Sequence, residues 1–262
     1  MGMPEWMKRT VFGVIFGGVI VGGTWWNPLL MQGMWWVVGM LIVWEYTRYG
    51  DFRAPFRAIL MVLTTLAYWG QAVGTFKDWM PWLTGALWIM GIGVAVDWRA
   101  VWRGWMLWWW NALFLWGVLG LAFSEGNFHP AVLLGVIFTV WIHDVVAYAL
   151  GNLIGGRRMA SQLSPGKRWS GAVGGWGAGT ILGGWLFGQI TVVSSPMAWM
   201  MAGAATLGAF VGDLIQSAWK RELGIKDSGQ IIPGHGGILD RMDALMVAAP
   251  AAYLVMKWMT TT

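Results

Sequence analysis

The sequence has no cysteine and little charge. Among its 262 residues there is no Cys, and only 11% are Asp, Glu, Lys or Arg. The absence of cysteine excludes disulfides, thiolate metal sites and cysteine nucleophiles, and it leaves the redox compartment undetermined. Soluble globular chains carry about 25% charged residues, whereas 57% of this chain is hydrophobic, which excludes a soluble fold and also disorder. The composition therefore predicts a polytopic membrane protein.

The chain contains many long apolar runs. A helix crosses the bilayer core with about 20 mostly apolar residues. Nine runs fit, roughly Thr10–Thr24, Leu29–Tyr46, Ala58–Phe76, Trp79–Asp97, Trp105–Phe123, Ala131–Leu150, Gly171–Val193, Met197–Ser217 and Asp243–Met259. We therefore expect an all-α polytopic integral membrane protein with about nine transmembrane helices. A cleaved signal peptide is the alternative for the first run, because Lys8 and Arg9 precede it, but no clear small-residue cleavage site follows.

The basic residues indicate an orientation. With nine spans and a cytoplasmic N-terminus, 15 of the 17 Lys and Arg residues fall on the cytoplasmic side and only Lys77 and Lys257 on the other. Cytoplasmic loops of membrane proteins carry such an excess, so we expect the N-terminus inside and the C-terminus outside. The net charge of +5 then reflects orientation and phosphate binding, and we expect no nucleic-acid partner.

No linker or soluble domain interrupts the apolar runs. We expect residues 1–130 to form N-terminal transmembrane helices that act as a lipid-facing scaffold, and residues 131–262 to form a C-terminal catalytic region. Two longer cytoplasmic loops, 151–170 and 218–242, are rich in Gly, Ser, Lys and Arg. Because binding and catalytic residues concentrate in such loops, we expect the working surface there.

Four acidic residues are the first candidates for a site. An acidic group inside a membrane helix is costly and marks function by default. Asp144 and Asp213 lie near the cytoplasmic ends of their runs, and Asp240 and Asp243 are spaced to share one helical face where the last helix begins. Four carboxylates at one level predict a hard divalent cation, with Mg²⁺ the common choice beside phosphates. The alternative is that each Asp pairs with a Lys or Arg, or caps a helix.

The stretch 212–243 also favours phosphate. Lys220, Arg221, Lys226 and Arg241 supply positive charge there, and Ser217 and Ser228 supply hydroxyls. Residues 233–237, Pro-Gly-His-Gly-Gly, predict a turn that presents backbone N–H groups before a helix, an arrangement that binds phosphate. Solvated basic residues at a membrane surface, a simple chain reversal and a structural role for His235 are the alternatives.

These residues resemble the signature of the phosphatidate cytidylyltransferase (CDP-diacylglycerol synthase) family. The matching positions are Ser217, Lys220-Arg221, Lys226-Asp227, Pro233 to Gly237, Asp240-Arg241 and Asp243. A second family segment matches at Asp144, Ala147, Tyr148, Gly151, Gly155, Ser164-Pro165, Lys167 and Gly171. The chain departs from the family pattern at Asn152, Gly166, Ser170 and Gln216, where the family usually has charged residues, and at Arg168, where it usually has a hydroxyl.

The resemblance implies that CTP and phosphatidic acid react to give CDP-diacylglycerol and pyrophosphate, with the active site on the cytoplasmic side of a bacterial cytoplasmic (inner) membrane. It implies Mg²⁺ and allows a second cation, and it suggests a homodimer. The implied metal ligands are Asp144, Asp213, Asp240 and Asp243. The implied residues for the CTP phosphates are Ser217, Lys220, Arg221, Lys226, His235, Gly236 and Gly237. The implied residues for the lipid phosphate or the leaving pyrophosphate are Ser164, Lys167, Arg168 and Arg241.

Three alternatives stay open on the sequence. A transporter is the usual interpretation of a many-helix chain with intramembrane acids, although it predicts charges near the midplane and an internal repeat, and neither is evident. A related enzyme could use another lipid or isoprenoid phosphate, or another nucleotide, because the signature selects phosphates better than acyl chains. An inactive scaffold is the third.

Overall fold

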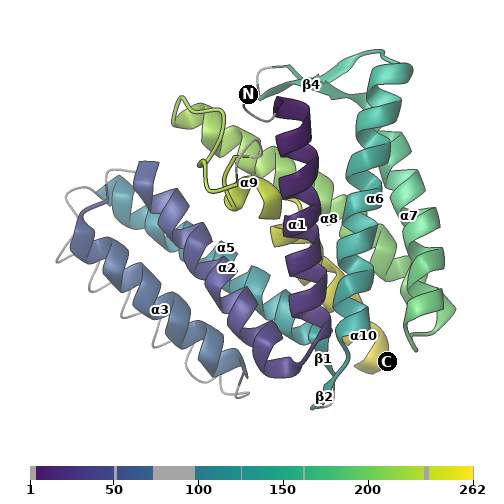
Figure 1. Cartoon of the computed structure of the whole chain (residues 1–262), viewed down its shortest axis with the longest axis horizontal. Helices are drawn as coiled ribbons and strands as arrows, with labels where there is room; N and C mark the ends of the chain where they lie inside the picture. Colours follow the sequence, from purple (N-terminus) through teal and green to yellow (C-terminus); the bar gives the residue numbers. More distant parts are fainter. Residues whose placement is uncertain are drawn as a thin grey trace. The chain divides into compact units, whose positions relative to one another are not determined.

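The computed structural model describes residues 4–49, 52–72, 98–124, 126–161, 163–232 and 236–261, and these are mostly helical (Figure 1). The helices are α1 (Glu5–Trp25), α2 (Pro28–Tyr49), α3 (Ala54–Ala72), α5 (Trp98–Ala122), α6 (Pro130–Leu153), α7 (Trp169–Ile190), α8 (Ser195–Glu222), α9 (Leu239–Met242) and α10 (Leu245–Thr261). Two short antiparallel hairpins, which the sequence did not predict, pair β1 (Phe123–Ser124) with β2 (Asn127–Phe128) and β3 (Arg158–Ala160) with β4 (Ser164–Arg168).

The helices suit a membrane. Within the described ranges, five segments are long and apolar enough to cross one: Pro28–Tyr49, Val101–Ala122, Pro130–Leu153, Ser195–Glu222 and Leu239–Thr261. This confirms a helical integral membrane protein. Eight of the predicted runs overlap a helix, and the ninth, Trp79–Asp97, lies outside the described residues. The number of spans and the orientation stay predictions.

One detail of the prediction is wrong. Asp240 and Asp243 do not share the face of a continuous helix, because α9 ends at Met242 and α10 begins at Leu245. The Asp243 carboxylate accepts a hydrogen bond from the Ala244 backbone N–H at 2.8 Å. A short acidic side chain that binds a neighbouring amide offers the backbone an alternative to the helix, and this accounts for the interruption.

The chain forms two compact units. The first consists of Met1–Leu119 with Ile225–Arg241, and the second of Gly120–Gly224 with Met242–Thr262. The predicted functional division at residue 130 follows a different boundary and stays a prediction. The signature stretch 212–243 changes unit at residue 225 and again at residue 242.

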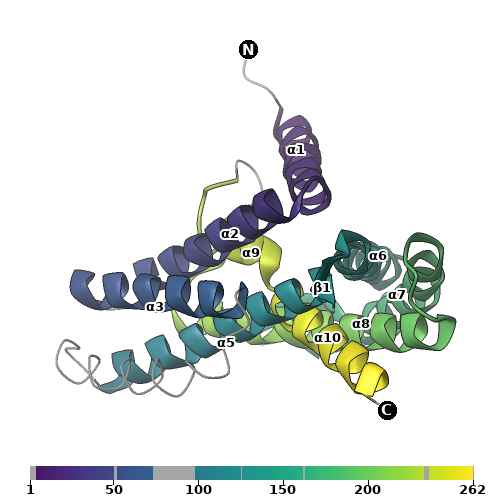
Figure 2. The same ribbon diagram turned by 90° about the horizontal axis from the view of Figure 1, so that it is seen from below.

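In the first unit, α2 packs beside α3 and α5 (Figure 2). Trp35 of α2 meets Phe114 of α5 edge-to-face, with ring centroids 5.8 Å apart, and both side chains are fully buried. The buried Asn111 side chain donates a hydrogen bond to the Gly39 carbonyl at 3.2 Å. An aromatic contact and a satisfied polar group therefore hold α5 against α2.

In the second unit, glycines allow α6 and α7 to pack closely. Gly171, Gly175, Gly179 and Gly183 are spaced by four residues and are all buried. A Cβ at Gly175 would lie 2.9 Å from the His143 carbonyl oxygen and 2.6 Å from the Ala147 Cβ. Stripes of small residues let membrane helices approach to backbone contact. This contact brings Asp144 on α6 and the candidates on β4, just before α7, into one unit.

We predict that Gly175→Ala destabilises the protein, because the added methyl group cannot fit against α6. Overpacking of this kind costs about 1–3 kcal/mol. The matched control is Gly177→Ala on the same helix, where a Cβ would meet nothing within 4 Å. Alanine favours helices over glycine by up to about 1 kcal/mol, so the control should be neutral or slightly stabilising. Thermal unfolding in detergent measures both, and equal melting temperatures would contradict the packing.

Candidate active site

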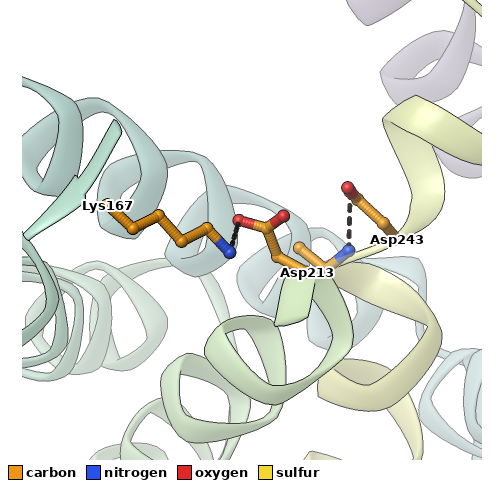
Figure 3. A network of polar contacts seen from close by, with 4 residues as sticks. Lys167, Asp213 and Asp243 are labelled. Atoms are coloured by element: carbon orange, nitrogen blue, oxygen red, sulfur yellow. Dashed lines mark hydrogen bonds and ion pairs between the residues drawn. The ribbon is translucent and has the colours of Figure 1, made fainter. Parts of the chain in front are cut away.

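The second unit brings together charged residues from four parts of the sequence: α6, β4, α8 and the turn before α10. The Lys167 ammonium on β4 forms an ion pair with the Asp213 carboxylate on α8 at 2.5 Å (Figure 3). Asp213 is half-buried, and so is Asp243 on the turn before α10. Asp243 interacts electrostatically with Asp213, Asp144 and Lys220. Three of the four predicted carboxylates and two predicted cations thus act on one another in this unit.

Gly212 explains how Asp213 reaches the Asp243 turn. A Cβ at Gly212 would collide with the Asp243 carbonyl oxygen, so any other residue would push α8 away from the turn. Four residues earlier along the helix, a Cβ at Gly208 would lie 2.8 Å from the Ala248 Cα. The α8–α10 contact depends on these two glycines, and it sets the place of Asp213.

The β3–β4 hairpin positions the basic residues of the loop 151–170. Ser164, Lys167 and Arg168 all belong to β4, and Arg168 pairs across the hairpin with Arg158. The Arg221 Nε at the end of α8 donates a hydrogen bond to the Leu163 carbonyl at 2.9 Å. This bond ties the hairpin to the helix that carries Asp213, and it gives Arg221 a structural contact as well as its charge.

One departure from the family pattern has a structural use. The Ser170 hydroxyl donates a hydrogen bond to the Gly155 carbonyl at 2.5 Å. Gly155 has a φ of +71°, a conformation that favours glycine. The serine therefore fastens the beginning of α7 to the loop that follows α6.

The end of α8 carries the first half of the signature. Ser217 is buried, Lys220 is half-buried, and Arg221 is exposed in the last turn. Basic residues in the last turn also complement the negative end of the helix dipole. Lys220 interacts electrostatically with Asp243, so it is one of the charged residues that act on one another in this unit.

The signature residues from Lys226 to Arg241 belong to the first unit. The Asp240 Oδ2 accepts hydrogen bonds from the Ser228 N–H at 2.7 Å and the Gly237 N–H at 3.0 Å. Gly236 has a φ of +85°. Lys226 and Arg241 are exposed, and His235 lies outside the described residues. We call residues 225–232 and 236–241 the signature loop, and two of its backbone N–H groups bind the Asp240 carboxylate.

Glu45, which was not among the candidates, contacts the signature loop within the first unit. It is fully buried on α2, and it accepts hydrogen bonds from Ser228, Ile238 and Leu239 of the signature loop. It lies inside the predicted run Leu29–Tyr46. An acidic residue within an apolar run is the signal that selected Asp144 and Asp213, and the same signal could have found Glu45.

His143 was also missed. It is buried on α6 beside Asp144, and its Nδ1 has no hydrogen-bond partner among the described residues. Asp213 and Lys167 are among the charges that act on it.

The candidate ligands fit a divalent cation in their chemistry. Asp144, Asp213 and Asp243 supply the oxygen donors that Mg²⁺ takes, and they belong to one unit. In the part of the chain that the structure describes, no three His, Asp or Glu side chains are gathered closely enough to form a ready-made metal site. The ammonium of Lys167 balances the charge of Asp213 in this arrangement.

The similarity to known proteins covers residues of both units. The profile of a family described as the cytidylyltransferase family matches residues 7–259. The chain belongs to this family. It is similar to a protein of Brucella abortus biovar 1 (strain 9-941) named phosphatidate cytidylyltransferase, with 29% identity over 265 residues that cover 96% of this chain and 93% of the relative.

Two further relatives of the same name match about half of the chain. One from Haemophilus influenzae is 40% identical over 146 residues, which cover 52% of this chain and 51% of the relative. One from Thermotoga maritima is 35% identical over 138 residues, which cover 50% of this chain and 51% of the relative. The family resemblance inferred from the signature is thereby confirmed, and it extends into the N-terminal half, where only the apolar pattern had suggested it.

We predict that Lys167 and Asp213 stabilise the second unit as a pair. Lys167→Met or Asp213→Asn alone should destabilise the protein, while the double variant should cost less than the sum. Since both side chains are partly exposed, at 21% and 38%, we expect a coupling of about 1 kcal/mol in the free energy of unfolding.

The control for this cycle is Lys257→Met, an exposed lysine on α10, combined with Asp213→Asn. That combination should be additive. Detergent-based unfolding of the single and double variants measures both cycles, and additivity in the Lys167 cycle would show that the ion pair contributes nothing.

Proposed function

We propose that this protein transfers the cytidylyl group of CTP to phosphatidic acid, producing CDP-diacylglycerol and pyrophosphate for phospholipid synthesis. Membership of the cytidylyltransferase family and the shared name of the relatives support this activity. One structural observation carries it to this chain. Within one unit, Asp213, which precedes the signature, pairs with Lys167 of the second family segment. Asp243 of the signature interacts with Asp144 of that segment, and also with Asp213 and Lys220.

The chemistry explains why such a group is useful. In this reaction an anionic lipid phosphate attacks the α-phosphorus of an anionic triphosphate. The nucleophile is already ionised near neutral pH, so the protein needs to neutralise charge and align the reactants more than it needs a strong base. Lys167, Lys220 and Arg221 can offset phosphate charge from one unit, because all three come from elements that contact one another or Asp243.

We assign Asp144, Asp213 and Asp243 to Mg²⁺, with Asp240 added on the sequence pattern. When bound, the ion would screen the charge of the phosphate oxygens. Ser217, Lys220, Arg221, Lys226, His235, Gly236 and Gly237 are assigned to the CTP phosphates. Ser164, Lys167, Arg168 and Arg241 are assigned to the lipid phosphate or to the pyrophosphate. Both assignments, and a homodimeric assembly, rest on the family resemblance.

We also propose nine spans, a cytoplasmic N-terminus, an external C-terminus and an active site on the cytoplasmic face of a bacterial inner membrane. The distribution of 15 basic residues against 2 supports this topology. A cytoplasmic site also suits the reactants, since CTP is a polar cytosolic nucleotide and phosphatidic acid lies in the leaflet.

The lack of cysteine makes the topology easy to test. We predict that Ser161→Cys, in the exposed turn of the β3–β4 hairpin, is protected from a membrane-impermeant maleimide in spheroplasts. Thr261→Cys, exposed at the end of α10, should be labelled. The unsubstituted protein is an unreactive control, because it contains no Cys. The reverse labelling pattern would overturn the orientation.

The proposed activity is tested with purified protein in detergent. Labelled CTP, phosphatidic acid and Mg²⁺ should yield a lipid-extractable cytidine product, whereas ATP in place of CTP, or added EDTA, should yield none. CTP binding without product would redirect the search to another lipid phosphate as acceptor. Failure to bind CTP at all would overturn the proposal.

We predict that Asp213→Ala abolishes turnover but leaves the protein inserted and folded, because Asp213 is central to the charged group of the second unit. Glu222→Ala is the matched control, as Glu222 is an exposed acidic residue at the end of the same helix. The assay above compares the two variants after their folding is checked by size-exclusion chromatography. Near-normal activity of Asp213→Ala would refute the assignment.

A further inference from the structure

Glu45 forms a buried contact between α2 and the signature loop, within the first unit. Its Oε1 accepts a hydrogen bond from the Ile238 N–H at 2.9 Å, and its Oε2 accepts one from the Leu239 N–H at 2.8 Å. The Ser228 hydroxyl donates to Oε2 as well, at 3.1 Å. A carboxylate with 0% exposure on an apolar helix is expensive, so three donors satisfy it here.

The pattern of donors requires a carboxylate. Each oxygen faces a backbone N–H, so each must act as an acceptor. A glutamine has the same shape, but one of its two terminal atoms would be an NH₂ group that meets an N–H donor. Glu45→Gln therefore keeps the size of the side chain and breaks one side of the contact.

Two glycines of the signature loop leave room for the Glu45 carboxylate. A Cβ at Gly229 would lie 2.6 Å from the Glu45 Oε1, and a Cβ at Gly237 would collide with the Oε2. Both residues are buried. Their lack of side chains leaves the space that the Glu45 carboxylate occupies, so the glycines of the signature serve this contact as well as the turn.

Residues that bind Glu45 also bind or adjoin Asp240. Ser228 donates through its hydroxyl to Glu45 and through its backbone N–H to Asp240. Leu239, whose N–H donates to Glu45, is the residue before Asp240, and the Gly237 N–H donates to the Asp240 Oδ2. A shift of the Glu45 carboxylate would move the backbone that orients Asp240.

We infer that Glu45 is a positioning residue of the transferase reaction, which holds the signature loop and the Asp240 carboxylate in the shape that CTP requires. The inference rests on the proposed function, in which this loop binds CTP. Residues that orient a binding group typically change affinity or rate about 10- to 100-fold when removed, without touching the substrate themselves.

The test compares Glu45→Gln with Thr47→Val in the full-length protein. Thr47 is equally buried on α2, two residues away, but its hydroxyl donates hydrogen bonds to the Val43 and Trp44 carbonyls of the same helix. We expect Glu45→Gln to raise the KM for CTP and to lower kcat/KM for CTP about 100-fold, with the KM for phosphatidic acid unchanged. Thr47→Val should leave both KM values unchanged.

Two further readouts separate positioning from a loss of folded protein. Ser228→Ala should raise the KM for CTP in the same direction, and its effect should shrink in the Glu45→Gln background, because the two side chains share one contact. Hydrogen–deuterium exchange of peptides that cover residues 225–241 should be faster in Glu45→Gln than in Thr47→Val. This measurement needs no activity.

The outcomes are distinct. Wild-type KM and kcat/KM in Glu45→Gln would overturn the inference, and so would a lower kcat with both KM values unchanged, which would indicate only a smaller folded fraction. If the unsubstituted protein makes no CDP-diacylglycerol, the proposed function fails, and the role of Glu45 in that reaction fails with it. The exchange measurement would then still show whether the contact to the loop exists.

Discussion

The cost of placing carboxylates in and beside apolar helices is the constraint on which this structure depends. Three of these carboxylates are satisfied by specific partners. Asp213 pairs with the Lys167 ammonium, Asp240 accepts two backbone N–H groups, and Glu45 accepts two backbone N–H groups and a hydroxyl. These partners come from distant parts of the chain, so satisfying the charges also organises the loops around them.

Glycine makes those partnerships sterically possible. The stripe on α7 brings α6 to backbone contact, Gly212 brings α8 against the Asp243 turn, and Gly237 leaves room for the Glu45 carboxylate. A single methyl group at any of these places would meet a neighbouring atom. The high glycine content, 39 residues, thus has a packing account at the positions that matter for the site.

The apolar runs predicted the helices well, because the length and composition needed to span a bilayer are local properties. The signature also identified the family, and the match to residues 7–259 confirmed it. The sequence did not predict the β3–β4 hairpin or the interruption before α10. The β3–β4 hairpin is too short to show a strand period, and the Asp243 side chain interrupts a helix that periodicity alone would continue.

The sequence by itself determined that this is a helical membrane protein of the cytidylyltransferase family, since apolar length and motif spacing can be read along the chain. Only the tertiary structure decided which charges meet. Lys167 and Asp213 are separated by 45 intervening residues, and Glu45 and Ser228 by 182, so no spacing rule relates them. Their contacts arise because a buried charge must find a partner wherever the folded chain provides one, and that choice is made in three dimensions.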